Sequence, residues 1–353
     1  MNSKERVRAA IRHKQPDQVP ADFGCVPEVW EKLQRHFHTD AQDEVLDRLG
    51  IDIRYIDADY IGPPLQSYEL EGERVDENCF GWKSRRHWNG VEYNNIAIDL
   101  PLDNISSARE VLDYRWPSPD WFDYDSIKRK CDQYQDKAIM IGHAGLYQWM
   151  TFMRNAEKIF LEMALDPDIP KAMIHKLVEF ELEYYSRILE AADGRIDILQ
   201  VYDDYGTQNG LLLSKEMWRE FFAENLKKLT GLAHRHGAFF MQHSCGAVQE
   251  LIPDLIACGV DILDPIQKVP GMEIERLKQA FGDKLTFHGG IDTQKLLPFG
   301  TPQEVERATE YTIDLLNRNG GYILCSSQYF ENDVPLENLL AVYRTRDLKY
   351  RMA

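Results

Sequence analysis

From about residue 137 onward the chain alternates two kinds of segment, and this alternation limits the folds open to it. Short apolar runs, rich in β-branched and aromatic residues, end in polar residues and glycines, and longer stretches with helical periodicity separate them. Strands joined by helices require a parallel sheet, because parallel neighbours need crossover connections. The short runs cover residues 138–143, 197–204, 239–245, 260–265, 284–290 and 321–325.

Two architectures satisfy this alternation: a doubly wound open sheet and an eight-stranded barrel. A glycine-rich phosphate loop after the first strand would favour the open sheet, and the sequence has none. Nearly every expected strand ends in polar, chemically reactive residues. In a (β/α)₈ barrel all strand carboxyl ends meet at one face, where the active site lies. We therefore predict an α/β protein with a (β/α)₈ TIM barrel.

The first part of the chain has a different character. Residues 51–56 fit an early barrel strand, and residues 82–100 fit a hairpin that turns at Asn89-Gly90. Two helices are expected at residues 4–13 and 27–36. We expect a single domain over residues 1–353, in which residues 1–110 include an N-terminal helical and hairpin elaboration.

Charge and hydropathy exclude several functional classes. The formal net charge of −17 disfavours nucleic acid as a partner, because phosphates would be repelled. No segment approaches the roughly eighteen apolar residues of a membrane span, and the charged N-terminus lacks the apolar core of a secretory signal. We expect a cytoplasmic protein. Six irregularly spaced cysteines then favour metal binding or catalysis over disulfides.

His243 and Cys245 follow the apolar run at residues 239–242. Side chains two residues apart in a strand point to the same side, so an imidazole and a thiol can meet there. Zinc favours these two ligand types. A buried histidine bonded to a carbonyl beside an inert thiol fits the pattern equally well. Cys325, at the end of a later strand, would complete a three-ligand zinc site with an open fourth position.

The other strand ends supply further candidates. Of Asp203 and Asp204, we expect one to cap a helix or form a loop salt bridge, and the other to orient a metal-bound histidine or a substrate. His288 fits a structural and a functional role equally well. The predicted catalytic residues are Asp204, His288 and Asp292, and the predicted substrate-binding residues from strand ends and nearby loops are Asp203, Asp264, Gln267 and His143.

Several segments resemble the uroporphyrinogen decarboxylase superfamily. The resemblance covers nearly the whole chain and implies the (β/α)₈ barrel. It rests on residues 3–7, 13–20, 243–248, 252–256, 259–263, 287–294 and 333–338, which include His243-Ser244-Cys245-Gly246 and Phe287-His288-Gly289-Gly290.

The N-terminal segment distinguishes between two branches of that superfamily. True uroporphyrinogen decarboxylases carry an arginine-rich segment that binds substrate carboxylates, whereas here no arginine follows Pro20 until Arg35. The resemblance therefore favours the corrinoid-dependent methyltransferases, such as the methylcobamide:coenzyme M enzymes, whose zinc ligands are His-x-Cys and a distant cysteine. His243 and Cys245 match the first two.

The third ligand departs from the family pattern. Alignment on the last apolar run places Gln328 at the position of the distant cysteine, so Gln328 is added to the predicted substrate-binding residues. Cys325 would have to act from a shifted position, or the third ligand is Gln328 or an acidic residue such as Asp203 or Asp204.

The resemblance implies zinc-dependent methyl transfer between a corrinoid, carried by a corrinoid-binding partner protein, and a small thiol or methyl donor. It leaves the direction of transfer open. Decarboxylation of a porphyrin precursor is the alternative.

Overall fold

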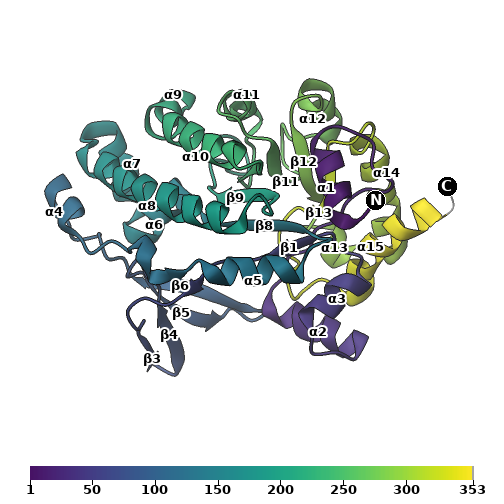
Figure 1. Ribbon diagram of the computed structural model, residues 1–353, viewed down its shortest axis with the longest axis horizontal. Helices are drawn as coiled ribbons and strands as arrows, with labels where there is room; N and C mark the ends of the chain where they lie inside the picture. Colours follow the sequence, from purple (N-terminus) through teal and green to yellow (C-terminus); the bar gives the residue numbers. More distant parts are fainter. Residues whose placement is uncertain (352–353) are drawn as a thin grey trace.

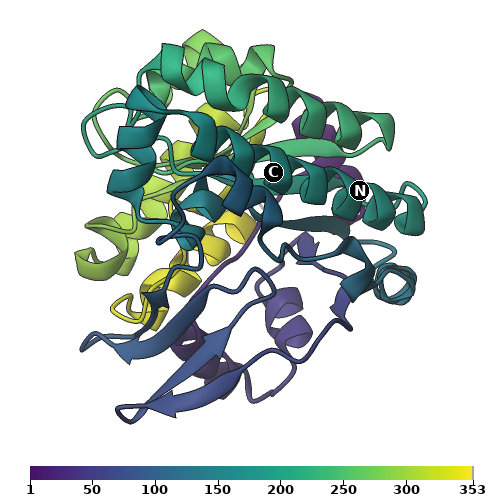
Figure 2. The ribbon, with the colours of Figure 1, turned by 90° about the vertical axis from the view of Figure 1, so that its left-hand side faces the viewer.

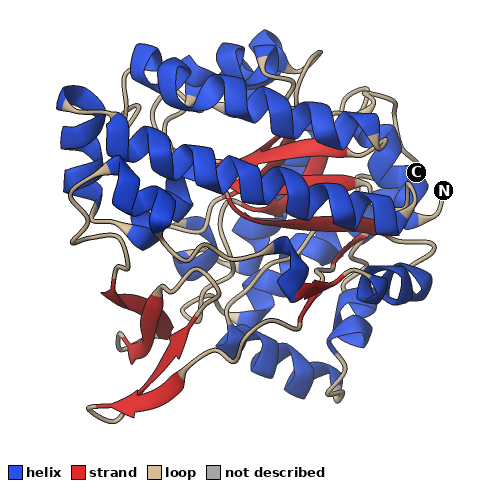
Figure 3. Cartoon of the chain, turned by 60° about the vertical axis from the view of Figure 1, so that its left-hand side comes forward, coloured by secondary structure: helices blue, strands red, loops and turns tan. Residues whose placement is uncertain are grey.

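The computed structural model describes residues 1–351. Its centre is a curled sheet of seven parallel strands, surrounded by helices (Figures 1 and 3). The strand order is β1-β8-β9-β10-β11-β12-β13, so the strands of this sheet follow one another in the order in which they occur along the chain. The strands are β1 (Ile53–Tyr55), β8 (Ala138–Ala144), β9 (Ile198–Tyr202), β10 (Phe239–His243), β11 (Ile262–Ile266), β12 (Thr286–Ile291) and β13 (Tyr322–Ser326).

Helices connect these strands and cover the outside of the sheet. The prediction of an α/β fold with a parallel sheet is confirmed. The longer helices after β1 are α5 (Asp125–Gln133), α6 (Leu146–Met153), α7 (Ala156–Leu165), α8 (Asp168–Ala192), α10 (Glu224–Arg235), α12 (Ile274–Phe281), α14 (Pro302–Leu316) and α15 (Leu336–Arg351). Shorter ones are α4 (Ala108–Asp113), α9 (Lys215–Trp218), α11 (Ile252–Ala257) and α13 (Leu296–Phe299).

The described residues form seven strands of the barrel and not the predicted eight. The gap between β13 and β1 is bridged by residues 20–22, which are too short and irregular to form a strand. On one side Ala21 bridges to Leu324 of β13, and on the other its carbonyl accepts the N–H of Asp52 at 2.9 Å. Arg6 Nη1 donates to the buried Asp52 carboxylate at 2.6 Å and so helps to hold residues 20–22 beside β1.

The interior of the sheet is apolar at the amino ends of its strands. Met140, Met241 and Ile262 point inward from β8, β10 and β11 and pack with Val7 and Ile11 of α1 (Ser3–Ile11). All of these side chains are buried. Helix α1 therefore closes this end of the sheet interior.

The N-terminal elaboration contains more β structure than predicted. The expected hairpin is present as β5 (Lys83–Trp88) and β6 (Tyr93–Asp99). A second hairpin, β3 (Ser67–Leu70) and β4 (Glu73–Glu77), extends it to a four-stranded antiparallel sheet that lies apart from the central one (Figure 2). Its acidic, largely exposed strands lack the apolar alternation that marks a strand in sequence.

Helices α2 (Pro27–Phe37) and α3 (Gln42–Arg48) and the short pair β2 (Asp59–Tyr60) and β7 (Phe122–Asp123) complete this part. Within the described residues, none of the helices combines the length and the apolar character needed to cross a bilayer.

Candidate metal centre and adjoining cavity

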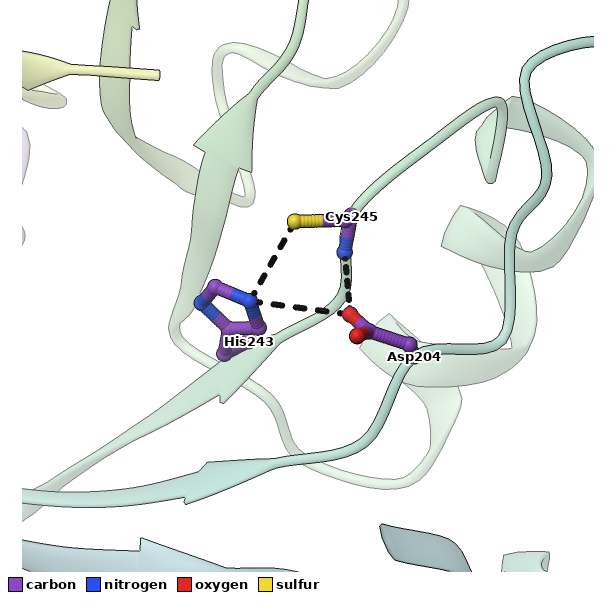
Figure 4. A group of neighbouring side chains, drawn as sticks. All are labelled: Asp204, His243 and Cys245. Atoms are coloured by element: carbon purple, nitrogen blue, oxygen red, sulfur yellow. Dashed lines mark hydrogen bonds and ion pairs between the residues drawn. The ribbon is translucent and has the colours of Figure 1, made fainter. Parts of the chain in front are cut away.

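Three side chains of metal-ligating type meet at the carboxyl end of the sheet: Asp204, His243 and Cys245. One donor atom from each lies within 4.8 Å of the other two (Figure 4). His243 Nε2 is 3.4 Å from Cys245 Sγ and 3.6 Å from Asp204 Oδ1. Asp204 Oδ1 also accepts the backbone N–H of Cys245 at 2.9 Å, which fixes the loop that carries the thiol.

Strand pairing explains why these three residues meet. β10 and β9 are neighbours with His243 opposite Tyr202, so Asp204, two residues beyond Tyr202, lies beside Cys245, two residues beyond His243. The turn after Cys245 requires glycine: Gly246 has φ of 84°, and a Cβ there would lie 2.6 Å from the Gly206 backbone. Gln267 supports the same turn by accepting the Gly246 N–H at 2.7 Å.

Cys325 lies elsewhere in the mouth. It is on β13, three strands from β10 in the sheet, and its buried thiol is 3.9 Å from Ser326 Oγ. Burial raises the pKa of Cys325, although the nearby His288 acts in the opposite direction. The three-residue group thus contains Asp204, one of the alternatives to Cys325 that the sequence left open for the third ligand. Gln328, from the loop after β13, donates its amide to Cys245 Sγ at 3.1 Å.

A carboxylate between two imidazoles orients His243. Asp264 Oδ2 lies 2.7 Å from His243 Nδ1, and Asp264 Oδ1 lies 2.6 Å from His288 Nδ1. His288 Nε2 in turn lies 3.1 Å from Asp22 Oδ2. With Nδ1 of His243 held by Asp264, its Nε2 is the nitrogen that faces Asp204 and Cys245.

This pairing shifts the pKa of each group. Burial alone disfavours the charged form of both imidazoles, but the Asp264 carboxylate raises the pKa of His243 and His288 well above the usual value. Burial alone would raise the pKa of Asp264, but the two histidines hold it far below its usual range. The structure therefore favours an ionised Asp264 between its two histidine partners.

A cavity of about 210 Å³ adjoins this group inside the mouth of the sheet. His243, Asp264, His288, Cys325 and Gln328 line it, and all were predicted to be site residues. Eight further lining residues were not predicted from the sequence: Asp22, Gly24, Tyr55, Gln200, Tyr202, Pro265, Ser326 and Tyr329. Tyr55 and Tyr202 lie near the ends of predicted strands, and this position could have marked them as site residues, whereas Asp22 follows a segment with no strand pattern.

Three predicted site residues have other surroundings. Asp203 caps α6: its carboxylate accepts the N–H of Gln148 and the hydroxyl of Tyr205, both at 2.8 Å, and burial raises its pKa to about 7. His143 stacks on Tyr185 with ring centroids 4.9 Å apart. Neither residue lines the cavity.

Asp292 is the third. Its carboxylate accepts the N–H of Gln294 at 2.8 Å. It lines a separate cavity of about 240 Å³ between α12 and α14.

Comparison with known proteins shows which family this chain belongs to. The sequence profile described as uroporphyrinogen decarboxylase (URO-D) matches residues 115–347. The chain belongs to the uroporphyrinogen decarboxylase family. A methylated-thiol–coenzyme M methyltransferase of Methanosarcina mazei is 28% identical over 179 residues, which is 51% of this chain and 44% of that protein. The aligned part therefore spans less than half of that relative.

A solved structure described as a methyltransferase from Methanosarcina mazei aligns over 99% of both chains with a TM-score of 0.66. Its sequence identity is 16%, so this likeness establishes the fold. Together the family match and the methylated-thiol relative support the methyltransferase branch of the superfamily, as the sequence predicted.

Proposed function

We propose that this chain catalyses zinc-dependent methyl transfer between a corrinoid, carried by a partner protein, and a small substrate. The observation that carries the proposal is the convergence of Asp204, His243 and Cys245 beside a cavity at the carboxyl ends of the strands. This is the face where barrel enzymes hold their active sites. The methyltransferase relatives support the class of reaction.

The donor set suits zinc. Imidazole nitrogen, thiolate and carboxylate oxygen are its usual protein ligands, and three of them leave a position for substrate. Asp264 on the far side of His243 supports the same assignment, since metal-binding histidines usually donate their second N–H to a carboxylate. When bound, zinc would act as a Lewis acid on a substrate sulfur or oxygen.

The chain's own residues have distinct tasks in this proposal. Asp264 holds His243 in the orientation that presents Nε2, and Asp204 fixes the Cys245 loop through its backbone N–H. His288, held between Asp264 and Asp22, lines the cavity and can carry a proton for the substrate heteroatom. We propose roles in substrate contact for Gln328 and in loop support for Gln267.

The cavity argues against porphyrin-precursor decarboxylation. None of the arginines and lysines among residues 1–351 lines it, and two carboxylates do. A polycarboxylate substrate would need cationic partners there.

Metal content tests the proposal. Purified wild-type protein should contain one equivalent of zinc by mass spectrometry, and Cys245→Ser and Asp204→Asn should lose most of it. Cys325→Ser is the matched cysteine control and should retain it. A zinc-free wild type would refute the proposal. Loss of zinc in Cys325→Ser together with retention in Asp204→Asn would instead restore the ligand set predicted from the sequence.

A further inference from the structure

A second cavity, of about 240 Å³, lies between α12 and α14. Its wall comes from three parts of the chain: the loop after β11 with the start of α12 (within residues 266–275), the end of β12 (290–292), and helices α13 and α14. It shares no lining residue with the cavity beside the metal group. The proposed methyl transfer therefore leaves this second cavity without a role.

Most of the buried wall of the second cavity is apolar. Val269, Met272 and Ile291 line it with buried side chains. The hydroxyl of Thr312, also in the wall, already donates to the Ala308 carbonyl within α14 at 2.9 Å. Because apolar surface gains free energy when it leaves water, this wall favours a ligand with a hydrocarbon body.

One charged side chain, that of Asp292, is buried in the same wall, and only 7% of this residue is exposed. Asp292 Oδ1 accepts the N–H of Gln294 at 2.8 Å, whereas Oδ2 has neither a hydrogen-bond partner nor an ion-pair partner among residues 1–351. A carboxylate oxygen binds a cationic N–H more strongly than a neutral one. Asp292 therefore provides an anchor for an ammonium group inside the cavity.

The charges at the rim do not supply that cation. Glu273 and Glu275 are acidic, and Lys268 is the one lysine or arginine that lines this cavity in the described part of the chain. Lys268 is exposed and forms no ion pair with Asp292. Three carboxylates and one ammonium group thus line the cavity, which favours a cationic ligand over an anionic one. A zinc ion at the proposed metal group would not reverse this balance, since its two anionic ligands offset its charge there.

We propose that the second cavity binds a small organic cation, a primary amine on a hydrocarbon body. The ammonium group donates to Asp292 Oδ2, and the hydrocarbon body packs on the apolar wall. Asp292, predicted from the sequence to be catalytic, is then a binding residue of this second site.

Gln267 connects the second cavity to the loop that carries Cys245. Its side chain lines the cavity, and its Oε1 accepts the Gly246 N–H at 2.7 Å. A ligand packed against Gln267 restrains this side chain and so keeps the hydrogen bond to Gly246 closed. Because amides exchange with solvent only when such bonds open, ligand binding should protect the Gly246 N–H.

A matched set of ligands tests the charge preference by titration calorimetry. The probes 2-phenylethylamine, 2-phenylethanol and phenylacetate share a phenyl ring and differ in charge. We expect the amine to bind wild-type protein about tenfold or more tightly than either of the others. Equal or weaker binding of the amine would overturn the proposal.

Four variants locate the binding site. Asp292→Asn should remove the preference for the amine and still bind 2-phenylethanol, and Ala308→Phe, which fills the cavity, should weaken binding of all three probes. Asp314→Asn, at an exposed position of α14 outside the cavity, is the matched control and should keep the preference. Cys245→Ser should keep it too, because the amine does not bind at the metal group. Retention of the preference in Asp292→Asn or Ala308→Phe, or its loss in Cys245→Ser, would overturn the proposal.

Hydrogen exchange followed by mass spectrometry tests the contact with Gln267. Saturating 2-phenylethylamine should slow exchange in a peptide that contains Gly246 several-fold in wild type, and should have no such effect in Gln267→Ala. Unchanged exchange in wild type would overturn the contact between ligand and Gln267. Neither measurement depends on zinc or on methyl transfer, so failure of the proposed function would leave this inference standing.

Discussion

Asp264→Asn is the most informative single substitution, because one carboxylate serves both imidazoles of the site. Asparagine has nearly the same shape but offers one oxygen and one NH₂ group. The oxygen can accept from only one of His243 and His288, at present 2.7 and 2.6 Å away, and the NH₂ group then faces the other ring. A hydrogen bond to a charged group contributes about 1.5–3 kcal/mol, so the free energy of unfolding should fall by about that amount.

The size of this loss should depend on pH. Asp264 has a depressed pKa in the folded protein, so its contribution is present above the unfolded value of about 3.9 and is lost as pH falls. His288 has a raised pKa, so its contribution is present below about 6.5 and is lost as pH rises through the folded value. The difference between wild type and Asp264→Asn should therefore be largest near pH 5–6 and smaller at pH 9.

Zinc affinity gives a second readout of the same substitution. Loss of a carboxylate behind a metal-binding histidine typically costs about 10–100-fold in affinity, which competition with a chromophoric chelator measures. Asp261→Asn is the matched control: Asp261 also pairs with a histidine, His234 at 2.7 Å, but just before the other end of β11. Unchanged zinc affinity in Asp264→Asn, or equal loss in both variants, would refute the proposed role of Asp264.

Two further substitutions test the packing around the site. Glu181 is buried, and its burial, together with the negative charge of Asp203, raises its pKa well above the usual value, so wild-type stability should fall as pH rises above about 4.3. Glu181→Gln should therefore raise Tm more at pH 8 than at pH 5, whereas the control Glu183→Gln, at an exposed position, should not. An equal shift of Tm at both pH values in Glu181→Gln would contradict this. Gly142→Ala would place a Cβ 2.0 Å from the Gln200 carbonyl oxygen, and urea unfolding should show a loss of about 1–3 kcal/mol. Gly210→Ala, with nothing within 4 Å, is its control, and an equal effect there would count against the packing argument.

Much of the central sheet could be predicted because its signals are local. Each apolar run that forms one of the strands β8 to β13 is flanked by sequence with helical periodicity. Strands connected by helices pair in parallel, so the parallel sheet could be predicted without knowledge of the strand order. The eighth barrel position could not be predicted in the same way. Residues 20–22 are held there by Leu324 and Asp52, residues far away in the chain, and not by any strand pattern of their own.

Spacing along a single segment is enough to predict that the side chains of His243 and Cys245 face one point. The neighbours of these two side chains depend on how the strands are arranged in the sheet. Strand order places the end of β9, with Asp204, directly beside β10, whereas Cys325 on β13 is three strands away. Asp264 lies between two histidines for the same reason: β11 is the strand between β10 and β12. The order of strands within a sheet is set by packing of the whole chain, so the local sequence around these residues does not show which of them become neighbours.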